Sequence, residues 1–409
     1  MTARPRETRA PVARPRTAGD ALRVALVAGT LGRGGAEKQL TYLARALRDA
    51  GVAVRVYALT RDECYAAELR AHGLPPVWIG RRPHPAGRLV TLVGAAARFR
   101  PHVVHAGHFF ANLYAAGAAR AAGAVAVGSI REDPRFGLAQ NGRWGPWLLR
   151  LPHALVANSE AARRQVVQLG RDAGRVHVLA NVIDLADFDA RARAAAPRPD
   201  TAGAMADGAM VAVGRLIAVK RFDRFLDALA LARRDAPRLT GAIVGDGPER
   251  PALEARAARL GLLPDGVRFL GQRDDVPALL QRAGALVLTS DQEGFPNVVL
   301  EGMAAALPIV TTPAGDAPMV VQDGVTGYVI PFEDVSALAR RLVALAAAPE
   351  LRRSLGAAGR RRAEQRYAPT GLADRLLAIY AAVAERERHA RLREALGRAR
   401  RIGDDVRGT

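Results

Sequence analysis

Two glutamates flank a turn containing glycine and proline in the segment SDQEGFPNVVLEGMAAALPIVTT, residues 290–312. Glu293 follows an apolar, strand-like stretch at 285–288, and Glu301 lies inside a helix that Pro296 can start at its first position. The backbone N–H groups of residues 294–298 would lie at the N-terminus of this helix, where phosphate and sugar oxygens bind readily. This arrangement suits a polyhydroxylated, phosphorylated ligand. Taken alone, the two glutamates fit equally well as a helix cap and a surface residue.

Two cations stand five residues apart in a second segment, VAVGRLIAVKRFDRFLDAL, residues 211–229. Arg215 and Lys220 follow a strand that ends at Gly214, and they can clamp a diphosphate, the arginine through its fork and the lysine as a point charge. The 60 basic residues include only two lysines, Lys38 and Lys220. A chain that so strongly prefers arginine indicates a chemical requirement for lysine at these sites; a random surface lysine is the alternative.

Short apolar runs alternate with helical patterns along most of the chain, which predicts an α/β protein with parallel, doubly wound sheets. In the first half, strands are expected at 23–29, 52–59, 103–106, 125–129, 155–158 and 176–180. In the second half they are expected at 210–213, 241–244, 267–270, 285–288, 309–312 and 327–330. Ligands of such sheets bind at the carboxyl ends of the strands, so the site is predicted between the two domains.

These patterns divide the chain into five parts. We expect a flexible basic tail at 1–20, a first Rossmann-like domain at 21–190 and a linker at 191–208, where the sequence is rich in Ala, Pro and Gly. A second Rossmann-like domain follows at 209–366. Residues 367–409 are expected to form a helical segment that crosses back toward the first domain and ends in a charged tail.

Composition excludes several classes of protein. The 409 residues are 49% hydrophobic with a mean hydropathy of −0.01, so the chain can bury a core and is not disordered overall. A single cysteine, Cys64, excludes an intramolecular disulfide. No apolar run approaches the roughly 20 residues of a membrane-spanning helix, and the N-terminus lacks the apolar core of a secretory signal. A cytoplasmic location is expected.

The net charge of +20 invites a nucleic-acid interpretation. The terminal segments 1–20 and 381–409 supply +6 of this charge, and no dense basic block is flanked by aromatic residues, which are 5% of the chain. An extended stacking surface for single strands is therefore poorly supported, and no nucleic-acid partner is expected. Diffuse basicity fits better with a phosphorylated substrate or peripheral contact with an anionic membrane.

In combination these motifs resemble the retaining glycosyltransferases of the GT-B fold, specifically glycosyltransferase family 4. The resemblance covers most of the chain and rests on five segments of the second half in the family's order: 214–220, 244–250 (VGDGPER), 269–271, 293–301 (EGFPNVVLE) and 323–331. Looser similarities in the first half are 32–40 (GRGGAEKQL), 101–108 and 156–161.

The resemblance implies roles for individual residues. Arg215, Lys220 and Glu293 would be catalytic, with the two cations on the donor diphosphate and Glu293 at the transferred sugar. Glu301 would accept hydrogen bonds from the ribose hydroxyls. The nucleotide-sugar site would also include Gly214, Gly294, Phe295, Pro296, Asn297 and Val298. The acceptor or sugar side would include Gly34, Gly35, His105 and His108, although a lone buried histidine is more often structural.

A family member of this kind would act by retention, with the leaving phosphate oxygen drawing the proton from the acceptor hydroxyl. The expected donor is a UDP-, GDP- or ADP-sugar, the acceptor is lipid-linked or a saccharide, and neither a cofactor nor a metal is expected. Some positions depart from the usual pattern: Arg221 stands where glycine is common, Gly302 and Ala306 replace the frequent alanine and glycine, and Met319 replaces a common glutamate.

Other functions remain open on the sequence. A nucleotide-sugar isomerase or a glycosyl phosphorylase can use the same fold. A dinucleotide-dependent oxidoreductase would read 244–250 as its fingerprint, but Arg250 stands where the third glycine belongs. A basic nucleic-acid-binding protein is the alternative from another class.

Overall fold

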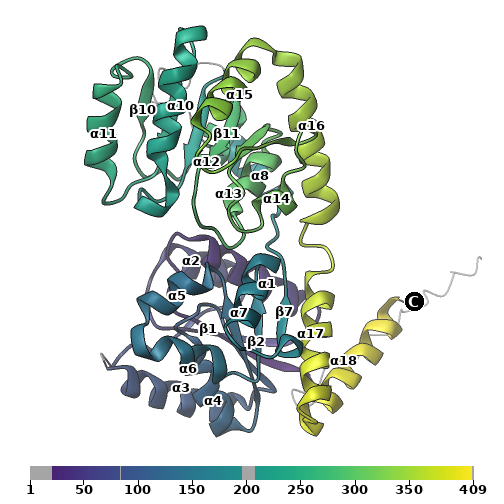
Figure 1. Cartoon of the computed structure of the whole chain (residues 1–409). Helices are drawn as coiled ribbons and strands as arrows, with labels where there is room; N and C mark the ends of the chain where they lie inside the picture. The colour runs from purple at the N-terminus through teal and green to yellow at the C-terminus, as the bar shows by residue number, and fades with distance from the viewer. Residues whose placement is uncertain (1–20, 83, 196–207, 408–409) are drawn as a thin grey trace, which may run out of the picture.

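The computed structural model describes residues 21–82, 84–195 and 208–407, so the predicted basic tail at 1–20 lies outside it. Within these ranges the chain forms two α/β domains, and the C-terminal helices run along one side of both domains (Figure 1).

The first domain contains a seven-stranded sheet in the order β3-β2-β1-β4-β5-β6-β7, with parallel pairing between neighbours. All six predicted strands are present, within a residue or two at their ends. The seventh, β3, has only two residues and follows two prolines, which explains why no pattern predicts it. The strands are β1 (Arg23–Ala28), β2 (Ala53–Ala58), β3 (Val77–Trp78), β4 (Val103–Ala106), β5 (Val125–Ile130), β6 (Ala154–Ala157) and β7 (Val176–Val178).

Helices cover both faces of this sheet, as expected for strands with near-continuous apolar sequences. In α1 (Gly35–Asp49), Leu40, Leu43, Ala44 and Leu47 recur at helical spacing and are buried. The other elements of the domain are α2 (Cys64–Ala71), α3 (Pro85–Phe99), α4 (Asn112–Ala122), α5 (Pro134–Gln140), η1 (Gly142–Trp144), α6 (Gly145–Arg150), α7 (Glu160–Gln168) and η2 (Ala173–Arg175).

The second domain repeats the plan with a six-stranded parallel sheet in the order β10-β9-β8-β11-β12-β13, and all six predicted strands are present. Its strands are β8 (Met210–Val213), β9 (Gly241–Val244), β10 (Val267–Phe269), β11 (Ala285–Leu288), β12 (Ile309–Thr311) and β13 (Gly327–Val329). Its helices are η3 (Ala218–Lys220), α10 (Phe222–Asp235), α11 (Arg250–Arg259), α12 (Val276–Arg282), α13 (Asn297–Ala304), α14 (Ala317–Val320), α15 (Val335–Ala347) and α16 (Pro349–Arg366).

The crossing between the domains differs from the predicted boundary at 190 and linker at 191–208. Helix α8 (Leu185–Ala194) includes the first residues of that linker and packs on α12 and α13 of the second domain. The Asp184 carboxylate caps this helix by accepting from the Asp187 N–H at 3.1 Å, and Phe188 is buried in the second domain's core. The chain therefore changes domain before residue 185. Residues 196–207 lie outside the described residues.

The C-terminal segment returns to the first domain, in agreement with the predicted course of residues 367–409. Helix α17 (Leu372–Arg386) packs against α1, and its Leu376, Tyr380 and Val383 are buried in the first domain's core. The final helix, α18 (Ala390–Arg407), is separate from α17 and inserts Leu392 and Leu396 into the same core. Its first half is therefore packed, although the sequence is increasingly charged.

Candidate active site

A cavity of about 940 Å³ separates the two domains at the carboxyl ends of both sheets. It brings together every residue predicted for the site except the two histidines. The predicted residues that line it are Gly34, Gly35, Gly214, Arg215, Lys220, Glu293, Gly294, Phe295, Pro296, Asn297, Val298 and Glu301. Segments as far apart in the sequence as Gly34 and Glu301 thus face one cleft.

Lys220 and Glu293 form an ion pair at one wall of the cavity. The Nζ of Lys220 lies 2.6 Å from Oε1 of Glu293, which also accepts a hydrogen bond from Ser290 Oγ at 2.7 Å. Lys220 closes the η3 turn after β8, and Glu293 lies in the loop after β11; these strands are adjacent in the sheet. Arg215 is exposed, and its guanidinium makes no hydrogen bond or ion pair within the described residues. A cation without a partner at this position is available to an anionic ligand.

Helix α13 begins at the cavity, one residue later than predicted. Pro296 is the residue before the first helical position, Asn297, so it caps the helix instead of starting it. The preceding residues Gly294 and Phe295 line the cavity together with this N-terminus, which places helix dipole and main-chain groups at the site. Glu301 lies one turn further along the helix and still reaches the cavity.

Glu301 is bonded to the first domain. Its Oε1 accepts from Nζ of Lys38 on α1 at 2.9 Å, and both side chains are mostly buried. Burial lowers the pKa of Lys38, but the neighbouring Glu301 carboxylate outweighs this effect and the pKa is raised overall. The two lysines of the chain, Lys38 and Lys220, are therefore both paired with the two glutamates of the 293–301 motif.

Glycines allow the two domains to approach each other closely at the base of the cleft. A Cβ added at Gly35, at the start of α1, would lie 2.0 Å from the side-chain nitrogen of Asn297 at the start of α13. A Cβ at Gly294 would lie 2.9 Å from Oδ1 of Asn158 of the first domain. The glycine turn of the first domain is therefore packed directly against the first residue of α13.

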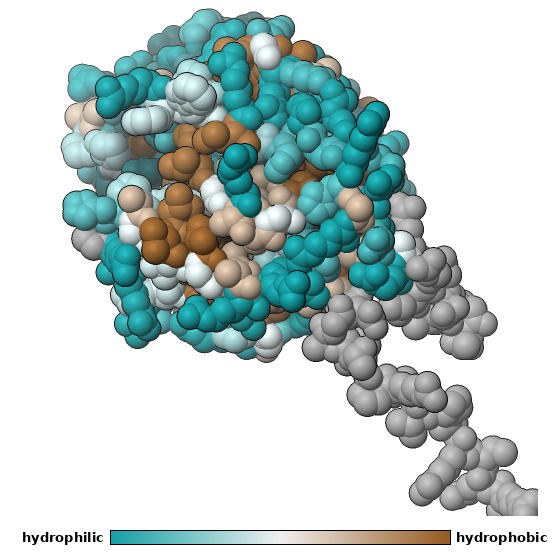
Figure 2. All heavy atoms as spheres, turned by 90° about the horizontal axis from the view of Figure 1, so that it is seen from below, coloured by the Kyte–Doolittle hydropathy of each residue, from teal (hydrophilic) through white to brown (hydrophobic). Residues whose placement is uncertain are grey.

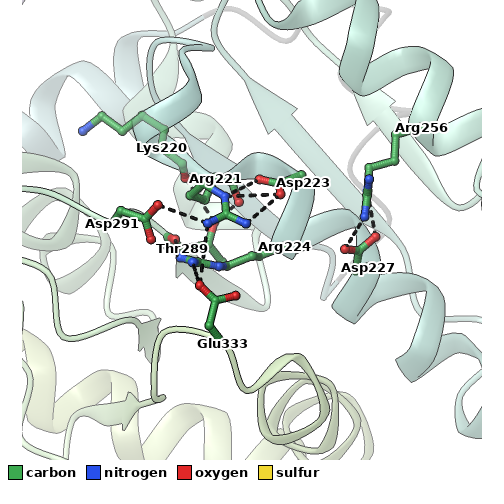
Figure 3. Close-up of polar contacts among 9 residues, drawn as sticks. All are labelled: Lys220, Arg221, Asp223, Arg224, Asp227, Arg256, Thr289, Asp291 and Glu333. Carbon is green, nitrogen blue, oxygen red and sulfur yellow. Dashed lines mark hydrogen bonds and ion pairs between the residues drawn. The ribbon is translucent and has the colours of Figure 1, made fainter.

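An ionic cluster behind the Lys220 turn connects it to the loop that holds Glu293 (Figure 3). The Asp291 N–H donates to the Val219 carbonyl at 2.9 Å, and Thr289 Oγ1 donates to the Arg221 carbonyl at 2.8 Å. Arg224, only 3% exposed, donates to the Thr289 carbonyl at 3.2 Å and pairs with Asp291 and Glu333. In Figure 3 the Lys220 side chain points away from this cluster, and its ammonium group pairs with Glu293 at the cavity instead.

Arg221, which replaces a common glycine, has a left-handed backbone with φ 50° and ψ 44°. This conformation is strained for a residue with a Cβ. Its guanidinium donates to Asp223 at 3.0 Å and to Asp291 at 3.1 Å, so the side chain supplies contacts that a glycine lacks. The departure from the family pattern is thus part of the ionic cluster.

His105 does not reach the cleft, contrary to its prediction as a sugar contact. It is buried under α17, where Nδ1 lies 2.8 Å from the Tyr380 hydroxyl and Nε2 lies 3.4 Å from Ser129 Oγ. Since Ser129 Oγ donates to the Ala106 carbonyl at 2.6 Å, Nε2 donates to Ser129 and Nδ1 accepts from Tyr380. Burial lowers the pKa of His105 to about 3, so the ring is neutral.

His108 is also outside the set of residues that line the cavity. Its Nδ1 accepts from the Gly29 N–H at 3.1 Å, and its Nε2 lies 3.1 Å from Oε1 of Glu37. Both ring nitrogens are thereby engaged within the first domain. The segment 101–108 ends at the edge of the sheet that faces the cleft. However, α17 covers the His105 ring and α1 covers the His108 ring.

The first domain contributes residues that the motifs do not predict. Arg131, Glu132 and Asp133 follow β5 directly and line the cavity, and Arg33 pairs with Asp274 across it. Burial lowers the pKa of Arg131 to about 10 and raises the pKa of Glu132. The position of residues 131–133 directly after the predicted strand at 125–129 is the signal that would have found them, since the carboxyl ends of the strands face the cleft.

No group of three or more His, Cys, Asp or Glu side chains in the described ranges is arranged to hold a metal ion. Among residues 21–82, 84–195 and 208–407, no helix combines the length and the hydropathy needed to cross a membrane.

Comparison with known proteins places this geometry in a family. Residues 33–187 match the family model described as Glycosyltransferase Family 4, and residues 208–348 match the model described as Glycosyl transferases group 1. The D-inositol 3-phosphate glycosyltransferase of Streptomyces scabiei is 31% identical over 319 residues, which are 72% of this chain and 67% of that protein. That of Streptomyces bingchenggensis is 30% identical over 318 residues, 72% of this chain and 66% of that protein. The chain thus spans about two thirds of the length of these relatives.

A crystal structure of Anabaena HepE in complex with UDP-glucose has the same fold. It superposes with a TM-score of 0.76 at 23% identity, covering 88% of this chain and 100% of HepE. The two facing Rossmann-like domains are therefore those of the GT-B fold. With both family models matched in sequence order, one in each domain, the chain belongs to glycosyltransferase family 4, the glycosyl transferases group 1.

Proposed function

We propose that the protein is a retaining glycosyltransferase that moves a sugar from a nucleoside diphosphate sugar to a hydroxyl group of an acceptor. One observation carries this proposal: Arg215, the Lys220–Glu293 pair, Glu301 and the N-terminus of α13 all face a single cavity between two domains. Family membership supports the reaction class. The complex of HepE with UDP-glucose supports a UDP-sugar as the donor, and GDP- and ADP-sugars are the other candidates.

In the proposed mechanism, Arg215 and Lys220 neutralise the charge that develops on the departing diphosphate. Preorganised charge of this kind is the largest single contribution to many enzymatic rates. Lys220 is held at Glu293 before the donor arrives, and Arg215, which has no protein partner within the described residues, is available to the diphosphate. Glu293 would then contact the transferred sugar, and Glu301 the ribose hydroxyls.

Transfer with retention requires the acceptor to attack on the face from which the diphosphate leaves. The bond from the anomeric carbon to the phosphate oxygen breaks, the bond to the acceptor oxygen forms, and the leaving phosphate oxygen takes the acceptor's proton. No protein nucleophile is needed, and no metal ion is invoked. The resemblance of the motifs to retaining enzymes supports this choice over inversion.

The acceptor is proposed to be lipid-linked or a saccharide, in the synthesis of cell-surface polysaccharide or glycolipid. A cytoplasmic enzyme with peripheral contact at the inner face of the membrane fits the basic charge of the chain.

A donor screen tests the proposal first. Purified protein is heated with UDP-, GDP- and ADP-sugars, and only ligands of the native state raise the melting temperature. Incubation with the radiolabelled form of the best donor and candidate acceptors then shows whether a glycoside forms, and NMR of the product reports its anomeric configuration. An epimerised donor, or cleavage that depends on phosphate without a glycoside, would instead identify an isomerase or a phosphorylase.

A further inference from the structure

Positive charge is concentrated in one part of the first domain. Residues 69–159 contain eleven arginines and no lysine, but only two acids, Glu132 and Asp133. This part includes α3, α4, α5 and α6, and Figure 1 shows these helices on one side of the first domain, with α5 nearest the second domain. This part of the first domain therefore carries +9, eleven arginines less two acids, of the net charge of +20.

Exposed aromatic residues occupy the same region. Trp144 is 62% exposed, Trp147 60% and Leu151 42%, and helical spacing of three and four residues puts them on one face of η1 and α6. Arg143 and Arg150 fall beside this face, and the Arg143 guanidinium lies 5.4 Å from the centre of the Trp144 ring. We call these five residues the tryptophan surface. Figure 2, which views the molecule from below, shows that apolar and hydrophilic side chains are mixed on the first domain's underside; the position of the tryptophan surface comes from the exposed fractions of its residues.

Helix α5 lies between the tryptophan surface and the cleft. Helix α5 packs on η1 and α6, and its Phe136 is 37% exposed while also lining the cavity. A molecule held at the tryptophan surface could therefore pass its head group along Phe136 to the catalytic residues.

We infer that the tryptophan surface docks the enzyme on an anionic lipid bilayer and delivers a lipid-linked acceptor to the cleft. Exposed tryptophans are costly in water but favourable at the boundary between head groups and acyl chains, where the ring is buried and the indole N–H stays hydrated. Arginines beside them attract anionic head groups. A protein partner would need acids to match the arginines, whereas a bilayer supplies both the negative charge and the apolar layer. This inference rests on the proposed function only for the identity of the acceptor; the docking on the bilayer does not depend on it.

Tryptophan fluorescence tests the docking directly, because the chain has only three tryptophans. In a Trp78→Phe background, Trp144 and Trp147 are the only reporters. With phosphatidylcholine vesicles containing 30% phosphatidylglycerol, we expect their emission to shift to shorter wavelength and to be quenched by lipids brominated on the acyl chain. Pure phosphatidylcholine vesicles should give little change, and high salt should weaken the binding.

Co-sedimentation of surface variants tests the residues. Arg143→Gln with Arg150→Gln should weaken partition into anionic vesicles about thirtyfold, at about one kcal/mol per arginine. Trp144→Ser with Trp147→Ser should abolish sedimentation with them. Matched controls in the second domain, Arg234→Gln with Arg238→Gln and Met319→Ser with Val325→Ser, change similarly exposed residues and should sediment as the parent protein does.

Two results would overturn the docking surface. One is unchanged emission and no sedimentation of the parent protein with anionic vesicles. The other is a parent protein that dimerises in sedimentation velocity while the tryptophan double variant stays monomeric, since the surface would then bind a second copy. A nucleotide-sugar thermal shift separates this from failure of the proposed function: a protein that binds the donor but ignores vesicles loses only the docking inference, whereas one that binds vesicles but no donor loses the proposed function.

Discussion

Lys38 and Glu301 join the two domains inside the cleft, with Nζ of the lysine 2.9 Å from Oε1 of the glutamate. The lysine belongs to the first helix of the first domain, and the glutamate belongs to the helix that begins at the site in the second domain. The carboxylate that we assign to the donor's ribose is thus already bonded across the cleft. A ribose hydroxyl must therefore donate to Oε2 of Glu301 or displace Lys38 from Oε1.

A double-mutant cycle measures this pair. We expect Lys38→Met and Glu301→Gln each to lower the free energy of unfolding, with a coupling energy of about 1–3 kcal/mol, because each single change leaves a mostly buried partner unsatisfied. Glu301→Gln should also weaken donor binding roughly tenfold or more, since an amide is a poorer acceptor for two hydroxyls. Urea unfolding gives the first quantity and titration calorimetry with the best donor the second. A coupling near zero would show that the pair contributes nothing.

Replacement of Lys220 by alanine should lower the rate of transfer by a factor of about 10² to 10³, as loss of one preorganised charge does elsewhere. Glu301→Ala should also reduce transfer strongly. Ser290 still donates to Glu293 in the Lys220 variant, so the fold should stay intact, and circular dichroism checks this. Lys220→Arg is the matched control and should retain part of the rate. A near-parental rate of transfer by the Lys220→Ala variant would show that Lys220 does not stabilise the departing diphosphate.

The ionic cluster behind the site predicts a contrast between two arginines that Figure 3 shows together. Arg224→Met should destabilise the second domain by about 1–3 kcal/mol, because Arg224 is buried and its loss takes a hydrogen-bond donor from the carbonyl of the buried Thr289. Arg256→Met removes a bidentate pair with Asp227 that is 39% and 26% exposed, so it should cost at most about 1 kcal/mol. If thermal unfolding shows the same loss of stability for the Arg224→Met and Arg256→Met variants, the result would contradict a buried positioning role for Arg224.

His105 predicts an acid sensitivity of the first domain. Because burial lowers its folded pKa from 6.5 to about 3, the unfolded state binds the proton more tightly throughout this window. The stabilisation is fully present above pH 6.5 and is lost as the pH falls toward 3, with a slope of about 1.4 kcal/mol per pH unit. His105→Asn removes this titration. Urea unfolding at pH 7 and pH 5 should show a shallower fall for the variant than for the parent, and parallel falls would refute a neutral, buried His105.

Much of the architecture follows from the sequence alone, for a local reason. The runs at 23–29 and 210–213 are apolar on both strand faces, and the residues from 40 to 47 repeat at helical spacing, so each element is determined by its own residues. The same holds for the motifs: Arg215, Lys220, Glu293 and Glu301 stand at strand or helix ends, and parallel sheets bring such ends to one edge. The one strand that no pattern predicted, β3, has two residues and too little sequence to show a period.

What the tertiary structure alone decided is which partner each side chain meets. His105 and His108 stand at the correct edge of the sheet, but burial under a helix from 275 residues later turns one of them into a structural contact of Tyr380. Helix α8 joins the second domain because Phe188 finds its core there, although the residue precedes the predicted linker. Lys38 meets Glu301 through packing between two domains and across 263 residues of the chain. Spacing along a sequence fixes the direction of a side chain on its own element; only the packing of elements fixes what lies opposite.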